Sequence, residues 1–381
     1  MDFTYDEEQQ ALREAVRGLV GKTYADFENR RRTVAEDPGF DESLWRRLAE
    51  MGILGLPFRE EYGGSGAGPV EVGIVAHEMG RVLAPEPYLT SVVLAGGIVA
   101  AAGTDEQRSE VLGALSEGTS VPAFAHAEPG TRWTSTASAV TASSSGDAWT
   151  LTGVKEPVPH GVRADLLVVS AALPDGGTGL FLVDPSDSGV AREGYRTHDG
   201  GRAARVALTD APAVPLGPAG ADQSGAIAAV LDIARVMACN EAAGAMEVAL
   251  DTTTSYLTSR KQFGVTLNTF QALNFRAADM YVSLELAQSV TLWATMVIAA
   301  GRPEEMSEAA SRAALQVSRA GRHIGQEAIQ LHGGIGMTAE YSIGSYTSRL
   351  TALDHLLGDG DHHLRLLAAA VGDHDEVDPL P

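Results

Sequence analysis

The sequence predicts an α+β protein in three parts, with a β domain between two helical ones. Apolar residues recur at helical spacing in the first 118 residues, for example at Leu12, Val16 and Leu19. From 119 to 225 the chain is rich in Gly, Pro, Ser and Thr and carries short apolar runs of strand length. We therefore expect an N-terminal helical domain (1–118), a middle β-barrel or sandwich domain (119–225), a C-terminal four-helix bundle (226–372) and a tail (373–381).

Composition narrows the function classes. A chain of 381 residues is too long for one ordinary core. A net charge of -22 argues against nucleic acid and against anionic membrane surfaces, which need clustered Lys and Arg. The single Cys239 excludes an internal disulfide and fits a reducing compartment. The acidic N-terminus is unlike a signal peptide, and no apolar run has the length of a membrane span, so we expect a cytoplasmic protein.

Caps and apolar spacing locate the helices. Asp6 and the two glutamates after it favour a helix start, and Asp41 precedes an amphipathic run that contains Trp45. Further helices are predicted over 70–82, 89–102, 227–259, 275–300, 307–332 and 347–371. Strands are predicted around Trp149 and over 166–171 and 180–183, followed by a proline- and glycine-rich connector over 212–225.

The stretch from Tyr256 to Met280 predicts one helix, a break at Phe263-Gly264 and a second helix. Arg260 suits the last turn of the first helix, and Thr269 suits the N-cap of the second. In one interpretation this is a helical hairpin with Arg260 solvated and Phe263 in the core. In the other, Arg260, Phe263 and Gln271 project together as a cation, a flat ring and an amide. Such a set suits a ligand with phosphates and an aromatic base.

The motif R-x-Q-F-G at 260–264, with F-Q at 270–271 and A-D-M at 278–280, resembles the signature of the acyl-CoA dehydrogenase family of flavoproteins. The resemblance extends over nearly the whole chain and implies that family's fold, an acyl-CoA thioester substrate and the cofactor FAD. It also implies that this corner reaches across a subunit interface to a neighbour's FAD, with Arg260 at the pyrophosphate. The run Gln330 to Gly334 resembles the family's Q-x-x-G-G element, although alone Gly333-Gly334 would be an ordinary helix terminus. The cofactor-binding residues implied by the resemblance are Arg260, Gln262, Phe263, Gln271, Gln330, Gly333 and Gly334.

The half of the flavin site that the family builds from its own β domain is eroded here. Where the family has T-E-P-x-A-G-S-D, this chain has Ala127 in place of the Thr and Arg132-Trp133 in place of the Gly-Ser pair. Where the family has K-x-W-I-T, it has Lys155-Glu156-Pro157-Val158-Pro159. Both prolines lack a backbone donor. A flavin bound in the usual way by this segment is therefore not expected.

The family's catalytic carboxylate is also missing from its two usual places. The resemblance sets Gly358 at the usual Glu and Ala234 at the alternative one, and it implies a CoA contact for Arg235. Two substitutes remain as candidate catalytic bases. Glu241 lies two turns beyond Ala234 in an apolar stretch, where burial raises a carboxyl pKa, and Asp359 follows Gly358. The small residues around Gly244 hint at a roomy channel beside Glu241.

Two other features receive plain interpretations. The acidic and His-rich segment from Asp354 to His363 resembles a metal cluster by composition, but its spacing favours a solvated or substrate-facing loop, and no metal site is predicted. Cys239 lies on an apolar helix face and is predicted to be a core residue rather than a nucleophile.

This chain keeps the residues that the family contributes to a neighbour's FAD, and it lacks the flavin-ring site of its own β domain, which we call the cradle. Such a chain is predicted to complete a partner's FAD site. The family includes actinobacterial α2β2 assemblies acting on steroid side-chain CoA thioesters, and this chain resembles their base-poor subunit. We expect an FAD-dependent acyl-CoA dehydrogenase in a tetramer with a homologous subunit or with itself, passing electrons to an electron-transfer flavoprotein or other acceptor. The alternatives are a homotetrameric enzyme using Glu241 or Asp359, a fold relative with redirected, flavin-independent acyl-thioester chemistry, and a structural subunit.

Overall fold

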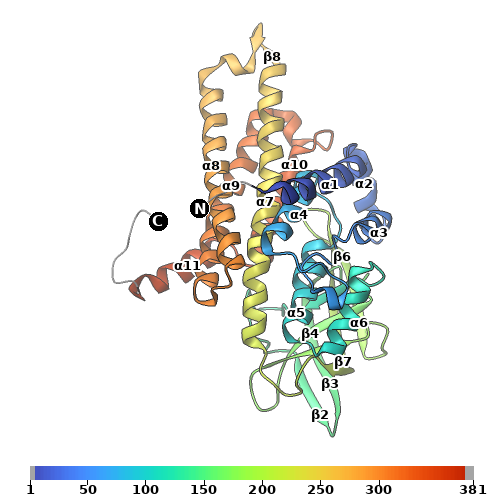
Figure 1. Ribbon diagram of the computed structural model, residues 1–381. Helices are drawn as coiled ribbons and strands as arrows, with labels where there is room; N and C mark the ends of the chain where they lie inside the picture. Colours follow the sequence, from blue (N-terminus) through green and yellow to red (C-terminus); the bar gives the residue numbers. More distant parts are fainter. Residues whose placement is uncertain (1–4, 374–381) are drawn as a thin grey trace.

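The computed structural model describes residues 5–373 and has the expected order of helical, β and helical parts (Figure 1). Helix α7 runs along most of the length of the molecule, with the β domain beside its first half and a small hairpin beyond its far end. The N-terminal helices and the C-terminal bundle share one apolar core, whereas the β domain has a core of its own. The two helical parts therefore pack against each other through a common apolar core.

Side-chain caps start the N-terminal helices where the sequence places them. Asp6 accepts from the backbone N–H of Gln9 at 2.8 Å, and Asp41 caps α3 in the same way. The predicted helix over 89–102 begins one residue earlier as a π-helical segment. The elements are α1 (Glu7–Thr23), α2 (Phe27–Ala35), α3 (Glu42–Glu50), η1 (Glu60–Tyr62), α4 (Pro69–Val82), η2 (Tyr88–Gly96), α5 (Gly97–Ala102) and α6 (Asp105–Ser116).

The middle domain is a small closed barrel. Strand pairing runs β4–β5–β7–β3–β2 and returns to β4 through Thr141 and Ala172, while β1 lies parallel to β4 and β6 extends the sheet beside β7. All three predicted strands are present. The strands are β1 (Pro122–Ala125), β2 (Thr141–Ser145), β3 (Ala148–Pro159), β4 (Leu166–Ala172), β5 (Thr178–Val183), β6 (Val190–Arg196) and β7 (Arg202–Pro215).

The C-terminal bundle packs α7, α8 and α9 side by side, with α10 and α11 across α9. Helix α8 is long and apolar enough to cross a membrane by length and composition alone, but here it packs on α7 and α9. The elements are α7 (Ser224–Ser259), β8 (Lys261–Gln262), β9 (Val265–Thr266), η3 (Leu267–Thr269), α8 (Gln271–Ala299), α9 (Pro303–His332), η4 (Gly333–Met337), α10 (Ile343–Leu356), α11 (Gly360–Ala370) and η5 (Val371–Asp373).

Three local predictions in this bundle are wrong. The helix predicted over 347–371 is two helices, because Gly358 has φ +126°, outside the helical range, and Asp359 caps α11. Thr269 is not the N-cap of α8, since its hydroxyl donates to the Thr266 carbonyl and Phe270 occupies that position without a side-chain bond. Arg260 lies one residue beyond α7 rather than in its last turn.

Candidate active site

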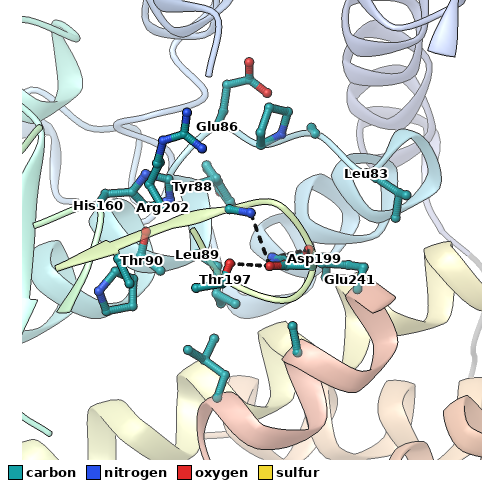
Figure 2. Close-up of a pocket in the computed structure, with 18 of the residues that line it drawn as sticks. Leu83, Glu86, Tyr88, Leu89, Thr90, His160, Thr197, Asp199, Arg202 and Glu241 are labelled. Atoms are coloured by element: carbon teal, nitrogen blue, oxygen red, sulfur yellow. Dashed lines mark hydrogen bonds and ion pairs between the residues drawn. The ribbon is translucent and has the colours of Figure 1, made fainter. Parts of the chain in front are cut away.

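A cavity of about 300 Å³ lies where the N-terminal helices, the barrel and the bundle meet (Figure 2). This volume is at the lower end of the range of small-molecule sites. One part of its wall is apolar and includes Ala76, Met79, Leu83, Leu89 and Leu356. The rest carries several charged side chains, so the cavity suits an apolar ligand that also bears polar groups.

Three charged side chains from distant parts of the chain meet at this cavity. Arg349 of α10 donates from Nε and Nη2 to Oε1 of Glu241 at 2.7 and 2.6 Å, and from Nη1 to Asp199 at 2.6 Å. Figure 2 shows Thr197, Asp199 and Glu241 gathered on one side of the cavity. Within residues 5–373, no side chain or backbone group donates to Oε2 of Glu241. Oε1 of Glu241 is therefore held by Arg349, whereas Oε2 accepts no hydrogen bond from the described residues.

The environment sets opposite pKa shifts for the two carboxyls. Burial raises the pKa of Glu241, and the Arg349 guanidinium opposes that shift only in part. Burial also acts on Asp199, but Arg349 and the Thr197 hydroxyl outweigh it and lower the pKa of Asp199 to about 2. The raised pKa predicted for Glu241 from the sequence is confirmed. Its role as a base stays a prediction.

Close contact between α4 and α7 places Glu241 at the cavity. A Cβ atom on Gly80 would lie 1.9 Å from the Glu241 carbonyl oxygen, and one on Gly244 would lie 2.0 Å from the carbonyl oxygen of His77. Only glycine permits two backbones to approach so closely. Gly244 therefore has no open space beside it, because α4 packs there, whereas Ala242 and Ala243 each line a cavity, and the channel predicted from these small residues stays a prediction.

A second cavity, of about 80 Å³, adjoins the first. Pro157, Pro159 and Leu356 line both. The smaller cavity is otherwise bounded by the loop after β1, by α7 and by the end of α10, at Ala127, Thr131, Trp133, Leu231, Arg235 and Leu357. For a molecule held at the wall that the two cavities share, the smaller cavity is the adjoining space in which a hydride acceptor could make the near contact that transfer needs.

Trp133 spans this smaller cavity from the barrel to the bundle. Its indole Nε1 donates to the His355 carbonyl at 3.0 Å, and its ring lies 5.2 Å from the ring of His362. The indole therefore links the loop after β1 to the ends of both α10 and α11. The space that remains holds roughly three water molecules.

A buried ion pair holds the loop that carries Trp133. Lys155 is fully buried and donates to Glu128 Oε1 at 2.8 Å, to the His126 carbonyl at 2.9 Å and to Ser170 Oγ at 3.0 Å. Glu128 also accepts from the backbone N–H groups of Ser138, Ala139 and Val140. Because these bonds join both ends of the loop to β3 and β4, Trp133 is presented on a fixed support.

These residues do not fit a flavin ring in the chain's own cradle. A cavity of about 80 Å³ is too small for the tricyclic isoalloxazine. Ala127 offers no hydroxyl, and Pro157 and Pro159 offer no N–H. The N–H of Glu156 is already donated to the Ala127 carbonyl at 2.8 Å. The expectation of an eroded cradle therefore agrees with the geometry.

The two usual positions of the base cannot supply one. Ala234 is buried and has no polar atom on its side chain. A Cβ atom on Gly358 would lie 2.5 Å from Nε2 of His363, so this position has no room for a side chain. Asp359 turns its carboxylate to the His362 N–H at 2.8 Å as the cap of α11, and it lines neither cavity.

Arg235 lies in the wall of the smaller cavity, with its guanidinium already engaged. Nε donates to the Leu357 carbonyl at 2.8 Å, and Nη1 donates to Asp232 at 2.5 Å. Cys239 is buried, and burial raises the pKa of its thiol to about 12, as suits the predicted core residue. No group of three or more His, Cys, Asp or Glu side chains in residues 5–373 is arranged to hold a metal ion.

Four of the implied cofactor-binding residues lie at the opposite end of the bundle, in a segment we call the arm (residues 260–271), and the other three, Gln330, Gly333 and Gly334, lie beside it at the end of α9 and the start of η4. Phe263 is 92% exposed at the tip of the β8–β9 hairpin, so the interpretation that buried it in the core is wrong. Rings of Tyr256 and His332 stack at 4.5 Å, which brings the end of α9 beside the end of α7. The side chains of Arg260, Gln262, Gln271 and Gln330 are exposed and make no hydrogen bond or ion pair within residues 5–373.

Arm and cradle cannot serve the same flavin. Helix α7 has 36 residues, which at 1.5 Å per residue makes it about 54 Å long. Arg235 lies in its first third and Arg260 follows its last residue, so most of that length separates them. Figure 1 shows the β8 hairpin and the barrel at opposite ends of the molecule. The ring and pyrophosphate of one FAD are joined only by a ribityl chain, which does not span this distance.

Sequence reasoning missed the residues that shape the larger cavity. Arg349 and Asp199 carry no local motif, and Arg30 reads as one of three consecutive arginines in α2. Trp133 was recognised as a departure from the family pattern, but not as a contact to α10 and α11. A signal for these positions exists only in three dimensions, because each acts on an element far away in the chain.

Comparison with known proteins identifies the family. Residues 6–119 match the acyl-CoA dehydrogenase N-terminal domain, and residues 224–372 match the C-terminal domain. The acyl-CoA dehydrogenase IpdE2 of Mycobacterium tuberculosis is 32% identical, over 97% of this chain and 99% of that protein.

Two solved structures have the same fold over nearly the whole chain. One is a variant of the Tcur3481–Tcur3483 steroid ACAD, with a TM-score of 0.87 and 33% identity, covering 96% of this chain and 98% of that one. The other is the ChsE4–ChsE5 complex from Mycobacterium tuberculosis, with a TM-score of 0.88 and 27% identity, covering 99% of this chain and all of that one. This protein therefore belongs to the acyl-CoA dehydrogenase family, flavoprotein oxidoreductases whose cofactor is FAD.

Proposed function

We propose that this chain is a subunit of a cytoplasmic acyl-CoA dehydrogenase tetramer and completes the FAD site of a homologous partner subunit. The observation that carries the proposal is the contrast between its two half-sites. Trp133 closes the chain's own flavin-ring position, whereas the arm presents Arg260 with no partner of its own among the described residues. The two-component names of the similar steroid enzymes support an assembly of unlike subunits.

The reaction is the α,β-dehydrogenation of an acyl-CoA thioester. A base removes the α-proton while hydride leaves the β-carbon, which yields the enoyl thioester. FAD bound in the partner's site would supply the hydride acceptor for this reaction, and an electron-transfer flavoprotein or other acceptor would take up the electrons. This chain supplies donors from Arg260, Gln262 and Gln271 to the partner's cofactor. The base comes from the partner, because Ala234 and Gly358 stand at the usual positions.

A homotetrameric enzyme using Glu241 is the second candidate. It is favoured by one observation, that Glu241 is buried at the wall of the larger cavity with a raised pKa and an open Oε2. Against it stands the size of the adjoining cavity, which leaves no room for a flavin ring beside that carboxylate.

The first test is the visible spectrum and the solution mass of the chain, purified alone and co-expressed with a homologous subunit. We expect a colourless chain alone and one FAD for every two chains in the mixed tetramer. One FAD per chain in a yellow homotetramer would overturn the proposal and favour Glu241 as base. Acyl-thioester turnover without flavin would indicate redirected chemistry, and absence of both flavin and CoA affinity in the mixed tetramer would indicate a structural subunit.

A further inference from the structure

The larger cavity contains a buried arginine whose terminal N–H groups have no partner in the fold. Arg30 of α2 is 5% exposed and lines the cavity. Its Nε donates to the Leu83 carbonyl at 2.6 Å, and its guanidinium lies 5.7 Å from the Phe27 ring. Nη1 and Nη2 make no hydrogen bond or ion pair with any residue between 5 and 373. Buried arginines are normally paired, so these N–H groups indicate a ligand that accepts hydrogen bonds.

The apolar part of the lining favours a ligand that is otherwise a hydrocarbon. Met79, Leu83 and Leu89 offer no hydrogen-bonding side chain to a bound molecule. A volume of about 300 Å³ accommodates a chain of medium length rather than a large polar molecule. The ligand that fits therefore combines one acceptor end with an apolar chain.

All the charged residues of the lining contribute to its charge balance. Three are arginines and three are carboxyls, namely Arg30, Arg202, Arg349, Glu86, Asp199 and Glu241. Arg349 donates to both Asp199 and Glu241, which holds these two carboxyls in their ionised forms. Arg202 lies 3.5 Å from Asp37, but the Asp37 side chain is 95% exposed and does not line the cavity, so water screens its charge. The lining is therefore neutral when Glu86 is ionised and carries one net positive charge when Glu86 is protonated.

Glu86 can adjust this balance by one proton. Its Oε1 accepts from the Tyr24 hydroxyl at 2.5 Å and from the Asp41 N–H at 3.2 Å, whereas Oε2 has no partner among the described residues. Burial raises the pKa of Glu86 to about 7, although these hydrogen bonds oppose the shift. The titratable side chains that contact or share the cavity with it are Tyr24, Asp41, Arg30, Tyr88, His160, His198, Asp199, Arg202, Glu241, Arg349 and His355. An anion that enters the cavity favours the protonated form of Glu86, which offsets the added charge.

The guanidinium of Arg30 and the single adjustable charge together favour a monoanion. Two N–H groups on a planar guanidinium match the two oxygens of a carboxylate. A neutral acceptor such as an amide makes a weaker bond with the same donors. A phosphate ester carries nearly two charges at neutral pH, of which Glu86 offsets only one, and the other would be buried without compensation.

We propose that the larger cavity binds a free apolar monocarboxylate, such as a medium-chain fatty acid, with its carboxylate on Nη1 and Nη2 of Arg30, its chain along Met79 and Leu89, and one proton taken up by Glu86. Figure 2 shows Glu86 on the side of the cavity away from Asp199 and Glu241. This inference goes beyond the proposed function, because it assigns a ligand to this chain's own cavity and involves no reaction there. It requires no flavin, base or thioester in this chain.

The first test is isothermal titration calorimetry of the full chain with octanoate, octanamide and octyl phosphate. A hydrogen bond between charged groups corresponds to roughly tenfold or more in affinity. We expect octanoate to bind about tenfold more tightly than octanamide, and octyl phosphate to bind more weakly than octanoate. Equal binding of octanoate and octanamide, tighter binding of octyl phosphate, or no saturable binding of octanoate would each overturn the inference.

The second readout is the number of protons taken up on binding. It is obtained at about pH 8 from the binding enthalpies in two buffers that differ in ionisation enthalpy. Because Glu86 is mostly ionised there before binding, uptake should approach one proton for each octanoate bound and should be absent for octanamide. The affinity for octanoate should fall as the pH rises above about 7, since an ionised Glu86 then has to gain a proton for the anion to bind.

Variants assign these two readouts to their residues. Arg30→Met removes the Nη donors and keeps the apolar stem, so octanoate and octanamide should bind it equally. Arg31→Met is the matched control and should keep the preference, because Arg31 is the next residue of α2, pairs with Glu28 and does not line the cavity. Glu86→Gln keeps an oxygen that accepts from Tyr24 and from the Asp41 N–H, so it should fold even if Arg30→Met does not. It should bind octanoate without proton uptake and with an affinity independent of pH.

The outcomes for the variants are equally decisive. A carboxylate preference that survives Arg30→Met, or a proton uptake that survives Glu86→Gln, would overturn the inference. Neither result bears on the proposed function, which the FAD content of the mixed tetramer decides separately.

Discussion

Individual side chains account for the difference between this active site and that of a self-sufficient enzyme of the family. Trp133 closes the flavin-ring position by bonding to the His355 carbonyl, and His363 takes the space that a side chain at position 358 would need. Gly358 also has φ +126°, which other residues adopt only under strain. A glutamate placed at Gly358 would therefore not restore a base without displacing His363.

Glu241 is expected to act through Arg349 as part of the cavity wall. Glu241→Gln removes one carboxylate from a buried ion pair and should lower the free energy of unfolding by about 3 kcal/mol, measured in urea. Asp251→Asn is the control, because Asp251 is an exposed carboxylate on the same helix. Its effect should stay within about 0.5 kcal/mol.

The same variant tests the catalytic alternative. In the mixed tetramer we expect Glu241→Gln to reduce turnover less than tenfold, the range that altered substrate packing produces. A loss of about a hundredfold or more with FAD content unchanged is the signature of a missing general base. That result would assign the base to Glu241 in this chain rather than to its partner.

At the scale of elements, the arm projects from the bundle and exposes its side chains, as a surface that binds another molecule does. The hairpin of β8 and β9 projects beyond the bundle with Phe263 at its tip, supported by an edge-on contact to Phe270 at 6.2 Å. The stacked Tyr256 and His332 rings fix the base of the arm against α9. The arm is thus ordered by its own chain, while the side chains of Arg260, Gln262 and Gln271 make no hydrogen bond or ion pair within residues 5–373, which is the arrangement expected of a preorganised donor surface.

Arg260→Ala tests the arm directly. Its side chain is exposed and makes no hydrogen bond or ion pair within residues 5–373, so the free energy of unfolding should not change. In the mixed tetramer, loss of a charge-assisted bond to a pyrophosphate should weaken FAD binding about tenfold to a hundredfold. The measurement is FAD released on dilution, followed by its fluorescence. Lys261→Ala, which removes the neighbouring exposed cation, should retain FAD, and equal loss from both variants would contradict the assigned role.

At the scale of the whole molecule, buried carboxylates hold elements within each part, and one of them joins the barrel to the C-terminal bundle. Glu78 of α4 accepts from Arg13 and Arg17 of α1, Glu128 anchors the loop after β1, and Asp199 joins the barrel to α10. Burial raises the pKa of each, but their cationic partners and hydrogen bonds outweigh burial and lower the pKa of all three to about 2. The ionised forms therefore hold α4 to α1, the loop after β1 to β3, and the barrel to α10.

These shifts predict a loss of stability in acid. The unfolded carboxyls titrate near pH 4, so between about pH 4.5 and pH 2 the unfolded state binds more protons than the folded state. The free energy of unfolding should therefore fall as the pH falls through this window. Burial raises the pKa of Glu86 to about 7 and also raises the pKa of Glu241 and Asp232, which acts in the opposite sense above about pH 4.5, outside the acid window. Urea midpoints at a series of pH values check this, and a midpoint unchanged from pH 5 to pH 3 would contradict it.

How much the sequence alone could predict varies with the range of the interaction involved. The caps at Asp6 and Asp41 and the strand at Leu166 were predictable, because caps and apolar periodicity act within a few residues. The break at Gly358 was missed, because apolar spacing continues across it and His363, which fills the space beside it, was not recognised as a constraint. Gly244 alone did not reveal whether it lies beside a channel, because small residues also permit helices to touch, as α4 and α7 do here.

The sequence by itself determined the family and the order of the three parts, and it predicted the loss of the usual base and the retention of the R-x-Q-F-G arm. These features are recognised from short sequence motifs and from the order of helical and strand patterns along the chain. Only the tertiary structure decided that arm and cradle lie at opposite ends of α7, that Trp133 closes the ring position and that Arg30 faces a cavity with its donors unmet. Each of these depends on contacts between residues far apart in the chain, and such contacts exist only once the chain has folded.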